Sequence, residues 1–315
     1  LHRLYGVQPL EERVPVGHPD VRYFELEKGG SIIGGVYLDL YAREGKRGGA
    51  WMNDYRGRRR FTTGDKIGQM QTPVAYLVCN FTPPVGGKEA RLSHDEIITL
   101  FHETGHGLHH LLTQVDELGV SGINGVEWDA VELPSQFMEN FVWEYDVLAE
   151  MSAHEENGAP LPRVLFDKMV AAKNFQRGMF MVRQMEFALF DMQIYSQSEQ
   201  SRLNEWPQVL EAVRREVSVV QPPAYNRFAL SFGHIFAGGY SAGYYSYSWA
   251  EVLSADAYAA FEESDDVKAT GKRFWQEVLA VGGSRSAMES FKAFRGREPQ
   301  IDALLRHSGF DADAA

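Results

Sequence analysis

The stretch FHETGH, residues 101–106, lies in a segment whose apolar residues recur with helical spacing. On a helix, His102 and His106 are one turn apart, about 6 Å along the axis, so both rings project from one face. Two imidazoles placed in this way can hold one zinc ion. Glu103 lies beside them and can take a proton from an attacking water. The stretch therefore predicts a helical metal site with a general base.

The same pattern also occurs by chance, and two histidines on a helix are often only polar surface. Here the flanking turns are strongly apolar, which places the pair near a core where polar groups need a partner. Gly105 and Gly107 each cost a helix about 1 kcal/mol relative to alanine, which indicates that something approaches its backbone closely. His109 and His110 have the wrong spacing to join the pair. We interpret them as supporting or surface residues.

The helix is predicted to begin at Ser93, because Ser93 and Glu96 have the spacing of a capping box. A third ligand is expected from the next segment with helical spacing, residues 128–144, and Glu132 is the candidate. Asp129 lies on the same face of that segment. It either accepts a hydrogen bond from a ligand histidine or, as a helix N-terminal carboxylate, satisfies the helix dipole. Both interpretations of Asp129 stay open.

Longer stretches of the sequence resemble the thimet oligopeptidase family of zinc peptidases, over nearly the whole chain. They are YLDLYAREGKRGGAW (37–51), QTPVAYL (71–77), HETGHGLHH (102–110), GINGV (122–126), DAVELPSQFMEN (129–140), SFGHIFAGGYSAGYYSY (231–247) and FKAFRGREP (291–299). The resemblance implies that His102, His106 and Glu132 are the ligands of one zinc ion and that Glu103 is the general base. It also implies a mainly α fold with a small β-sheet (α+β), a zincin-like metallopeptidase catalytic domain.

Residues 234–247 contain four tyrosines and three glycines. One interpretation is a flexible loop with aromatic anchors in the core. Buried tyrosine hydroxyls need partners, so another is a polar cavity whose O–H donors stabilise an oxyanion, at about 3–4 kcal/mol each. The resemblance implies that this segment faces the zinc. We expect catalytic roles for His234, Tyr240 and Tyr247, and substrate contacts from His234, Tyr240 and Tyr244.

Composition limits the classes of protein that the chain can belong to. Its 315 residues, 44% of them hydrophobic, suffice for a large core. A net charge of -12 without a basic stripe argues against nucleic-acid binding, and we interpret the arginines at 56 and 58–60 as a solvated loop. No apolar run reaches the ~18 residues of a membrane span, and the N-terminal residues lack a signal-peptide pattern. Cys79, the only cysteine, is consistent with a reducing compartment. We expect a cytoplasmic protein.

Residues 1–20 are interpreted as a connecting segment and 21–315 as the zinc peptidase catalytic domain, with a small sheet in 21–92 and a helical part in 93–310. Val21–Glu27 and Ser31–Tyr41 read as a hairpin around two glycines. Val74–Phe81 is predicted to be either an edge strand that pairs with an extended peptide or an ordinary buried strand. The Met and Phe residues of 161–196 are interpreted as core, and 311–315 as a frayed tail.

The predicted function is zinc-dependent endoproteolysis of short unstructured peptides. The alternatives are a peptidyl-dipeptidase that releases C-terminal dipeptides and a non-catalytic peptide-binding fragment. A structural zinc site normally has four protein ligands, which argues against the last. The chain does not begin with methionine, and proteins of the resembled family carry roughly as much chain again on the N-terminal side. We therefore expect a truncated or processed chain that self-associates or needs the missing half to cover an apolar face.

Overall fold

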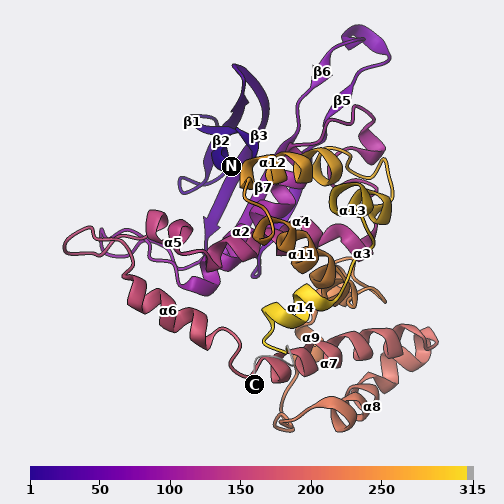
Figure 1. The fold of residues 1–315 in the computed structure, drawn as a ribbon. Helices are drawn as coiled ribbons and strands as arrows, with labels where there is room; N and C mark the ends of the chain where they lie inside the picture. Colours follow the sequence, from indigo (N-terminus) through magenta and orange to yellow (C-terminus); the bar gives the residue numbers. More distant parts are fainter. Residues whose placement is uncertain (311–315) are drawn as a thin grey trace.

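The computed structural model describes residues 1–310, with residues 199–203 described by their backbone alone. As predicted, the chain is mainly helical with one small sheet, which is mixed (Figure 1). Strand order in the sheet is β1-β2-β3-β7-β4, and only β3 and β7 among neighbouring strands are parallel. The strands are β1 (Gln8–Glu12), β2 (Arg22–Lys28), β3 (Ser31–Tyr41), β4 (Trp51–Arg56) and β7 (Val74–Phe81), with β5 (Arg59–Arg60) and β6 (Met70–Gln71) in a separate ribbon.

The predicted hairpin is confirmed as β2 and β3. Gly29 and Gly30 connect the strands with φ values of 60° and 80°, which glycine adopts without a steric penalty. The expectation for residues 1–20 differs from the structure. This segment contains α1 and strand β1, which pairs antiparallel with β2, and it contributes Leu4, Tyr5 and Val7 to the core. Strand β1 was not predicted because most of its side chains are exposed, and its place in the sheet depends on backbone pairing with β2.

Strand β7 lies inside the sheet, between β3 and β4, so of the two interpretations left open the buried strand is correct. Edge strand β4 was not predicted. It follows a charged, glycine-rich turn at residues 43–49. Four of its six residues are exposed, so its sequence shows little alternation of apolar and polar residues. The arginines that we expected in a solvated loop are also ordered: Arg58 and Arg60 both form ion pairs with Asp116.

Fourteen α-helices and four short 3₁₀ or π segments are assigned within residues 1–310. The predicted tail, residues 311–315, lies outside the described residues. No helix among the described residues combines the length and the apolar character needed to cross a bilayer. The helices are α1 (His2–Tyr5), α2 (His94–Leu111), α3 (Trp128–Val131), α4 (Leu133–Glu139), α5 (Tyr145–Met151), α6 (Arg163–Ala172), α7 (Arg177–Tyr195), α8 (Glu199–Val217), α9 (Phe228–Ser231), α10 (Gly233–Ala237), α11 (Ser246–Glu262), α12 (Val267–Phe274), α13 (Ala287–Arg295) and α14 (Asp302–His307); the short segments are η1 (Gly64–Lys66), η2 (Leu118–Val120), η3 (Asn140–Trp143) and η4 (Trp275–Leu279).

Of the four hydrophobic cores among the described residues, the two largest lie in different parts of the molecule. The larger core joins the sheet to α2, α4 and the C-terminal helices, and at its centre the rings of Phe137 and Phe274 stack with centroids 4.2 Å apart. The smaller core lies between α7, α8 and the segment that leads into α11, and it includes Phe190, Phe232 and Tyr244. In Figure 1 the paired helices α7 and α8 lie at the bottom, away from the sheet.

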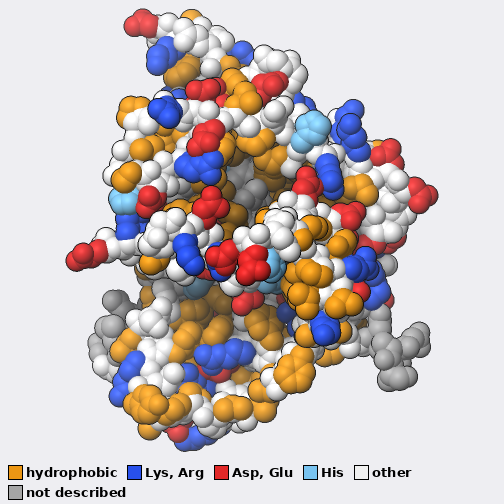
Figure 2. Space-filling model, turned by 90° about the vertical axis from the view of Figure 1, so that its left-hand side faces the viewer, with side chains coloured by type: hydrophobic (Ala, Val, Ile, Leu, Met, Phe, Trp, Pro, Cys, Tyr) orange, Lys and Arg blue, Asp and Glu red, His pale blue; other side chains and the backbone are white. Residues whose placement is uncertain are grey.

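The prediction that the Met and Phe residues of 161–196 are core is wrong for much of that segment. Phe175 is 78% exposed and Phe180 49% exposed. On the face drawn in Figure 2, hydrophobic side chains gather over the lower part of the molecule, below a hollow. Other exposed apolar residues of α6 and α7 are Val164, Leu165, Val170, Met179, Met185 and Met192. Helical spacing identified an apolar face here, but it did not reveal whether another element covers it.

Candidate active site

Helix α2 carries the histidine pair, and its start is fixed by the predicted capping box. Ser93 Oγ accepts a hydrogen bond from the Glu96 N–H at 3.2 Å, and Glu96 Oε2 accepts one from the Ser93 N–H at 2.8 Å. The second half of the helix is buried against strand β7 and helix α4. The cap and this packing together set which face of α2 points toward the neighbouring helix.

Glu132 lies at the point where the predicted helix 128–144 is interrupted, after α3 ends and before α4 begins. Pro134 follows at the start of α4, where its missing N–H costs nothing. Gly105 of α2 packs directly on the backbone of Pro134 and Ser135. This close contact confirms the expectation that a glycine of α2 admits another backbone, and it brings Glu132 beside the two histidines.

The structure brings His102, His106 and Glu132 together. Glu132 Oε2 lies 3.2 Å from His102 Nε2 and 3.1 Å from His106 Nε2, and one ligand atom from each residue lies within 4.8 Å of the others. Burial opposes ionisation of Glu132, but the charge of His106 and hydrogen bonds from both histidines outweigh it and lower its pKa well below the usual range. Two imidazole nitrogens and a buried carboxylate form a donor set that fits a divalent metal ion.

A carboxylate does orient a ligand histidine, but it is Glu139 and not Asp129. His102 Nδ1 lies 2.6 Å from Glu139 Oε1, which directs Nε2 toward Glu132. Asp129 Oδ1 instead accepts a hydrogen bond from the Tyr245 hydroxyl at 2.6 Å. The sequence analysis missed Glu139. The available signal was its position seven residues after Glu132, two helical turns along the same face.

Glu103 is 5% exposed, and its Oε2 atom is buried without a hydrogen-bond partner among the described residues. Burial raises its pKa, while the nearby charges of His102 and His106 act in the opposite direction. An oxygen left without a partner at this depth is costly unless something else occupies the site. Glu103, the residue directly after His102, therefore carries a carboxylate oxygen without a partner.

His109 and His110 of α2 are both buried, so the surface interpretation is wrong for both. His110 is 0% exposed, and its Nε2 lies 3.0 Å from the backbone oxygen of Arg56, the last residue of β4. His109 is 3% exposed on the other side of the helix. His110 thus links the active-site helix to the edge strand.

A cavity of about 920 Å³, here called the catalytic cavity, opens over the ligand cluster. One wall is the edge strand β4 with the loop before it, and the floor is formed by His102, Glu103, His106 and Glu132. The facing wall includes His234, Tyr240 and Tyr247, so the tyrosine segment does face the histidine pair. An extended chain entering this cavity would run beside an unpaired strand edge.

The residues of the tyrosine segment for which we predicted roles lie in different surroundings. The Tyr240 hydroxyl donates a hydrogen bond to Glu132 Oε1, and its ring stacks on Tyr247 with centroids 4.9 Å apart. Tyr244 is buried in the smaller core, where its hydroxyl donates to Gln184 Oε1 at 3.1 Å and burial raises its pKa to about 12. His234 lies on the cavity wall. The surrounding protein displaces water from its ring, and this loss of solvation lowers its pKa; the charge of Glu132 acts in the opposite direction, and that of Arg47 lowers the pKa further.

The tyrosine segment is anchored to α7 by one carboxylate. Asp191 Oδ1 accepts a hydrogen bond from the Ala242 N–H at 2.8 Å, and Oδ2 accepts one from the Tyr244 N–H at 2.9 Å. Ala242 has a φ of 54°, a left-handed conformation unusual for alanine. The paired hydrogen bonds hold the backbone in this strained turn, so Asp191 fixes where the tyrosines project.

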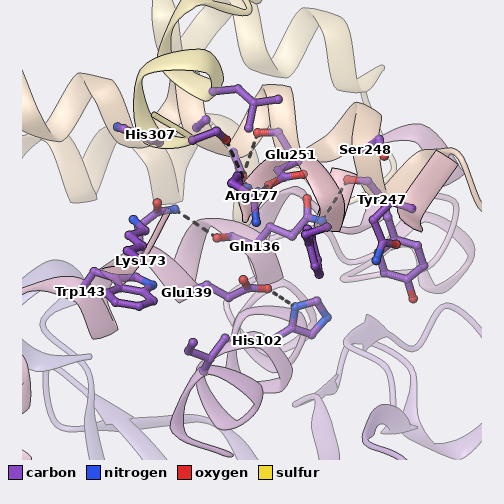
Figure 3. A pocket seen from close by; sticks show the side chains of 18 of the residues that line it. His102, Gln136, Glu139, Trp143, Lys173, Arg177, Tyr247, Ser248, Glu251 and His307 are labelled. Carbon is purple, nitrogen blue, oxygen red and sulfur yellow. Dashed lines mark hydrogen bonds and ion pairs between the residues drawn. The ribbon is translucent and has the colours of Figure 1, made fainter. Parts of the chain in front are cut away.

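A second chamber, of about 330 Å³, lies on the far side of His102 and Tyr247 (Figure 3). Glu139 reaches His102 from its wall, and Arg177 on α7 pairs with Glu251 on α11 across from them. Lys173 lies over the ring of Trp143, 4.9 Å from its centroid. The cleft therefore continues beyond the ligand cluster into a chamber with charges of both signs.

A donor set for a divalent metal ion beside a carboxylate without a partner is an arrangement typical of metallopeptidases. The chain belongs to peptidase family M3, whose family model matches residues 1–310.

Relatives agree with this assignment, and a solved structure shares the fold. The chain is 54% identical to oligopeptidase A of Escherichia coli K12 over 98% of its length, and 37% identical to a dipeptidyl carboxypeptidase of Salmonella typhimurium, also over 98%. It spans only 45% of the length of each. The fold is similar to that of metallocarboxypeptidase 1 of Trypanosoma cruzi, with a TM-score of 0.55 and 13% identity over 87% of this chain and 55% of that one.

Proposed function

We propose that the chain is the catalytic part of a zinc endopeptidase that cleaves short, unstructured peptides. One observation carries the proposal: Glu103, which has a buried oxygen without a partner, lines the same cavity as His102, His106 and Glu132. A site that only stored a metal would need no such carboxylate. The name of the 54% identical relative, oligopeptidase A, supports peptides as substrates.

His102, His106 and Glu132 would hold the zinc ion. When bound there, zinc supplies Lewis acidity, which polarises a carbonyl and lowers the pKa of water. Three protein ligands rather than four are typical of catalytic zinc sites. The hydrogen bond from His102 to Glu139 and the bond from Ser135 Oγ to Glu132 Oε2, at 2.8 Å, keep two of the three ligands oriented.

Glu103 is the general base in this proposal. Its carboxylate accepts a proton from the water that attacks the scissile carbonyl and then donates it to the nitrogen of the departing amine. Its raised pKa favours both halves of this transfer, because a carboxylate of low pKa holds a proton too weakly to deliver it. Tyr247, on the facing wall, donates its hydroxyl to the carbonyl oxygen as negative charge develops there.

Edge strand β4 binds the peptide backbone. Its outer N–H and C=O groups have no neighbouring strand in the sheet, so an extended peptide can add as a further strand. The active-site helix lies against the same sheet, an arrangement that supports a zincin-like architecture. A folded protein cannot present such an extended segment, and this accounts for the preference for unstructured peptides.

A peptidyl-dipeptidase is the second candidate, supported by the 37% identity to a dipeptidyl carboxypeptidase. Such an enzyme must recognise a free C-terminal carboxylate. Peptides with amidated C-termini separate the two candidates, since an endopeptidase cleaves them as well as their free-acid counterparts. We place the activity in the cytoplasm, where the buried thiol of Cys79 would stay reduced.

The proposal is tested with Glu103→Gln and His106→Ala, using His154→Ala at an exposed position as the control. Glu103→Gln should retain stoichiometric zinc and lose about 10²–10⁴-fold in kcat. His106→Ala should lose zinc, measured by metal analysis after dialysis. Near-normal turnover in Glu103→Gln would eliminate the mechanism, and full zinc affinity in His106→Ala would eliminate the ligand assignment.

A further inference from the structure

The loop between β3 and β4 forms one corner of the catalytic cavity and is tied firmly to the sheet. Lys46 Nζ donates a hydrogen bond to the carbonyl oxygen of Cys79 at 2.5 Å. Asn80 Nδ2 donates to the carbonyl oxygens of Arg47 and Gly49 at 2.9 and 2.7 Å. These contacts fix the backbone of Arg47 relative to β7, so its side chain leaves the loop from a defined position.

Arg47 is the only lysine or arginine among the described residues that line the catalytic cavity. Among the side chains that the structure describes, no carboxylate lies within ion-pair distance of its guanidinium. The guanidinium lies 5.7 Å from the ring centroid of Trp51, and a terminal nitrogen of Arg47 lies 3.8 Å from the position that a Cβ would take at Gly233. In a chain with 43 acidic and 31 basic residues, an arginine left without a carboxylate partner inside a cavity is available to a ligand.

The position of Arg47 relative to Glu103 sets which end of a bound peptide it meets. Glu103 and residues 47–53 line the same cavity. Of strand β4, only the first half, Trp51 to Asn53, belongs to this lining. The far end of β4, at Arg56, therefore lies away from the cavity, and the Arg47 loop precedes the half of the strand that lines it.

A peptide that pairs antiparallel with β4 would run from Arg56 toward Trp51 and then past the loop. Antiparallel pairing is slightly the more stable arrangement per residue. Residues before the scissile bond then lie along β4, and residues after it lie along the loop that carries Arg47.

We propose, resting on the peptidase function above, that Arg47 is a specificity-determining residue that binds a carboxylate on the C-terminal side of the scissile bond. Guanidinium groups bind carboxylates through two parallel hydrogen bonds. The carboxylate can come from an acidic side chain or from the C-terminus of a short peptide. Either source gives the enzyme a preference for peptides that are acidic just after the cleavage point.

The second chamber offers two other cations, and both are engaged. Arg177 is paired with Glu251, and Lys173 lies over the ring of Trp143. Arg47 lies over the ring of Trp51 at 5.7 Å, a looser contact of the same kind as that of Lys173. Lys173→Gln therefore serves as the matched comparison for Arg47→Gln, because it removes a cation from the same cleft without touching the β4 side.

The experiment measures peptide binding to Glu103→Gln protein loaded with zinc, with and without Arg47→Gln, Arg47→Lys or Lys173→Gln. Three peptides are compared with a neutral parent peptide whose C-terminus is amidated. The first has a glutamate after the cleavage point, and the second has a free C-terminal carboxylate after the cleavage point. The third has a glutamate before the cleavage point. Arg47→Gln should weaken binding of the first or second peptide by about 10-fold or more, since hydrogen bonds to charged groups are strong. Binding of the neutral parent and of the third peptide should stay within about twofold.

Arg47→Lys should retain part of the preference, because lysine keeps the charge but not the paired hydrogen bonds. The first and second peptides identify the source of the carboxylate. Equal losses for neutral and acidic peptides, a loss confined to glutamate before the cleavage point, or a preference removed by Lys173→Gln instead would each overturn the inference. Cleavage by the wild-type protein without any effect of Arg47→Gln on binding would overturn this inference and leave the proposed function standing. Arg47-dependent binding by a wild-type protein that cleaves no peptide would contradict the proposed function and leave Arg47 only as a carboxylate-binding residue.

Discussion

The Cβ position of Gly105 on α2 lies 2.3 Å from the carbonyl oxygen of Pro134 on α4. Real Cβ atoms do not approach a carbonyl oxygen this closely, so only glycine permits the two helices to touch here. The contact falls between His102 and His106 on one helix and two residues from Glu132 on the other. The spacing of the metal ligands therefore depends on a residue that carries no ligand atom.

Gly105→Ala should force α2 and α4 apart. Alanine gains up to about 1 kcal/mol of helix propensity over glycine, but the clash is with backbone and cannot be relieved by a side-chain rotation. We expect a net loss of about 2 kcal/mol or more in the free energy of unfolding, together with weaker zinc binding, measured by denaturant titration and by competition with a chelator.

Gly107→Ala is the control for this variant, two residues along the same helix. Its Cβ position lies 3.1 Å from a terminal carbon of Leu77, a side chain that can move. Stability within about 1 kcal/mol of wild type and unchanged zinc affinity are expected. Similar losses in both variants would show that glycine flexibility, not the contact with Pro134, matters in α2.

Glu139→Gln should lower zinc affinity by about 10–100-fold, because it weakens the hydrogen bond that orients His102. Asp129→Asn is the matched control, since Asp129 bonds Tyr245 and no ligand. Zinc dissociation constants measured with a competing chelator test the pair. If Asp129→Asn had the larger effect, the assignment of Glu139 would be wrong.

Tyr247→Phe should lower kcat by about 10²-fold or more with little change in KM, because its hydroxyl is proposed to bond an oxygen that is charged only in the transition state. Tyr244→Phe is the companion variant. It removes a buried hydrogen bond to Gln184 and should cost about 1 kcal/mol of stability without a comparable loss in kcat. An effect of Tyr247→Phe confined to KM would make Tyr247 a ground-state contact.

Acid should weaken the C-terminal end of the fold through Glu262. Hydrogen bonds from His307 and Arg306, opposed by burial, lower its pKa to about 2 from an ordinary value of 4.5. A lowered pKa means that the stabilisation is complete above about pH 4.5 and disappears as the pH falls toward 2. Because the side chain is 34% exposed, we expect about 1–2 kcal/mol rather than the full shift.

Glu262→Gln tests this expectation. Its free energy of unfolding should fall below that of wild type at pH 7, and the difference should shrink steadily between pH 4.5 and pH 2.5. A difference that is constant over this range would show that packing, not charge, accounts for the effect.

The sequence predicted the features of the site that depend on local spacing. The capping box at Ser93, the shared face of His102 and His106, and Glu132 on the next segment all follow from helical periodicity, and the structure places them as expected. Glu139 was missed because its role depends on how α2 crosses α4. That crossing depends on tertiary packing, which the spacing of residues in one segment does not report. In the sequence, only the glycine at position 105 indicated that another backbone packs closely on α2.

Two other features depend on contacts that periodicity cannot report. Strand β1 has mostly exposed side chains, so its sequence lacks the apolar alternation that would predict a strand at the edge of the sheet. Phe175 and Phe180 follow an apolar pattern typical of a core, yet both are exposed. An apolar stripe indicates that a face is suited to burial, and only the arrangement of the other elements decides whether it is buried.

Because the two largest cores support different parts of the site, the protein can lose its activity without losing its metal ion. The metal ligands are supported by the larger core, whereas His234 and Tyr247 pack with the smaller one, which Asp191 ties to α7. Local opening of a small unit needs less free energy than global unfolding. On gentle heating, inactivation should therefore precede release of zinc, and a sample that still contains its full complement of metal can already have lost its activity.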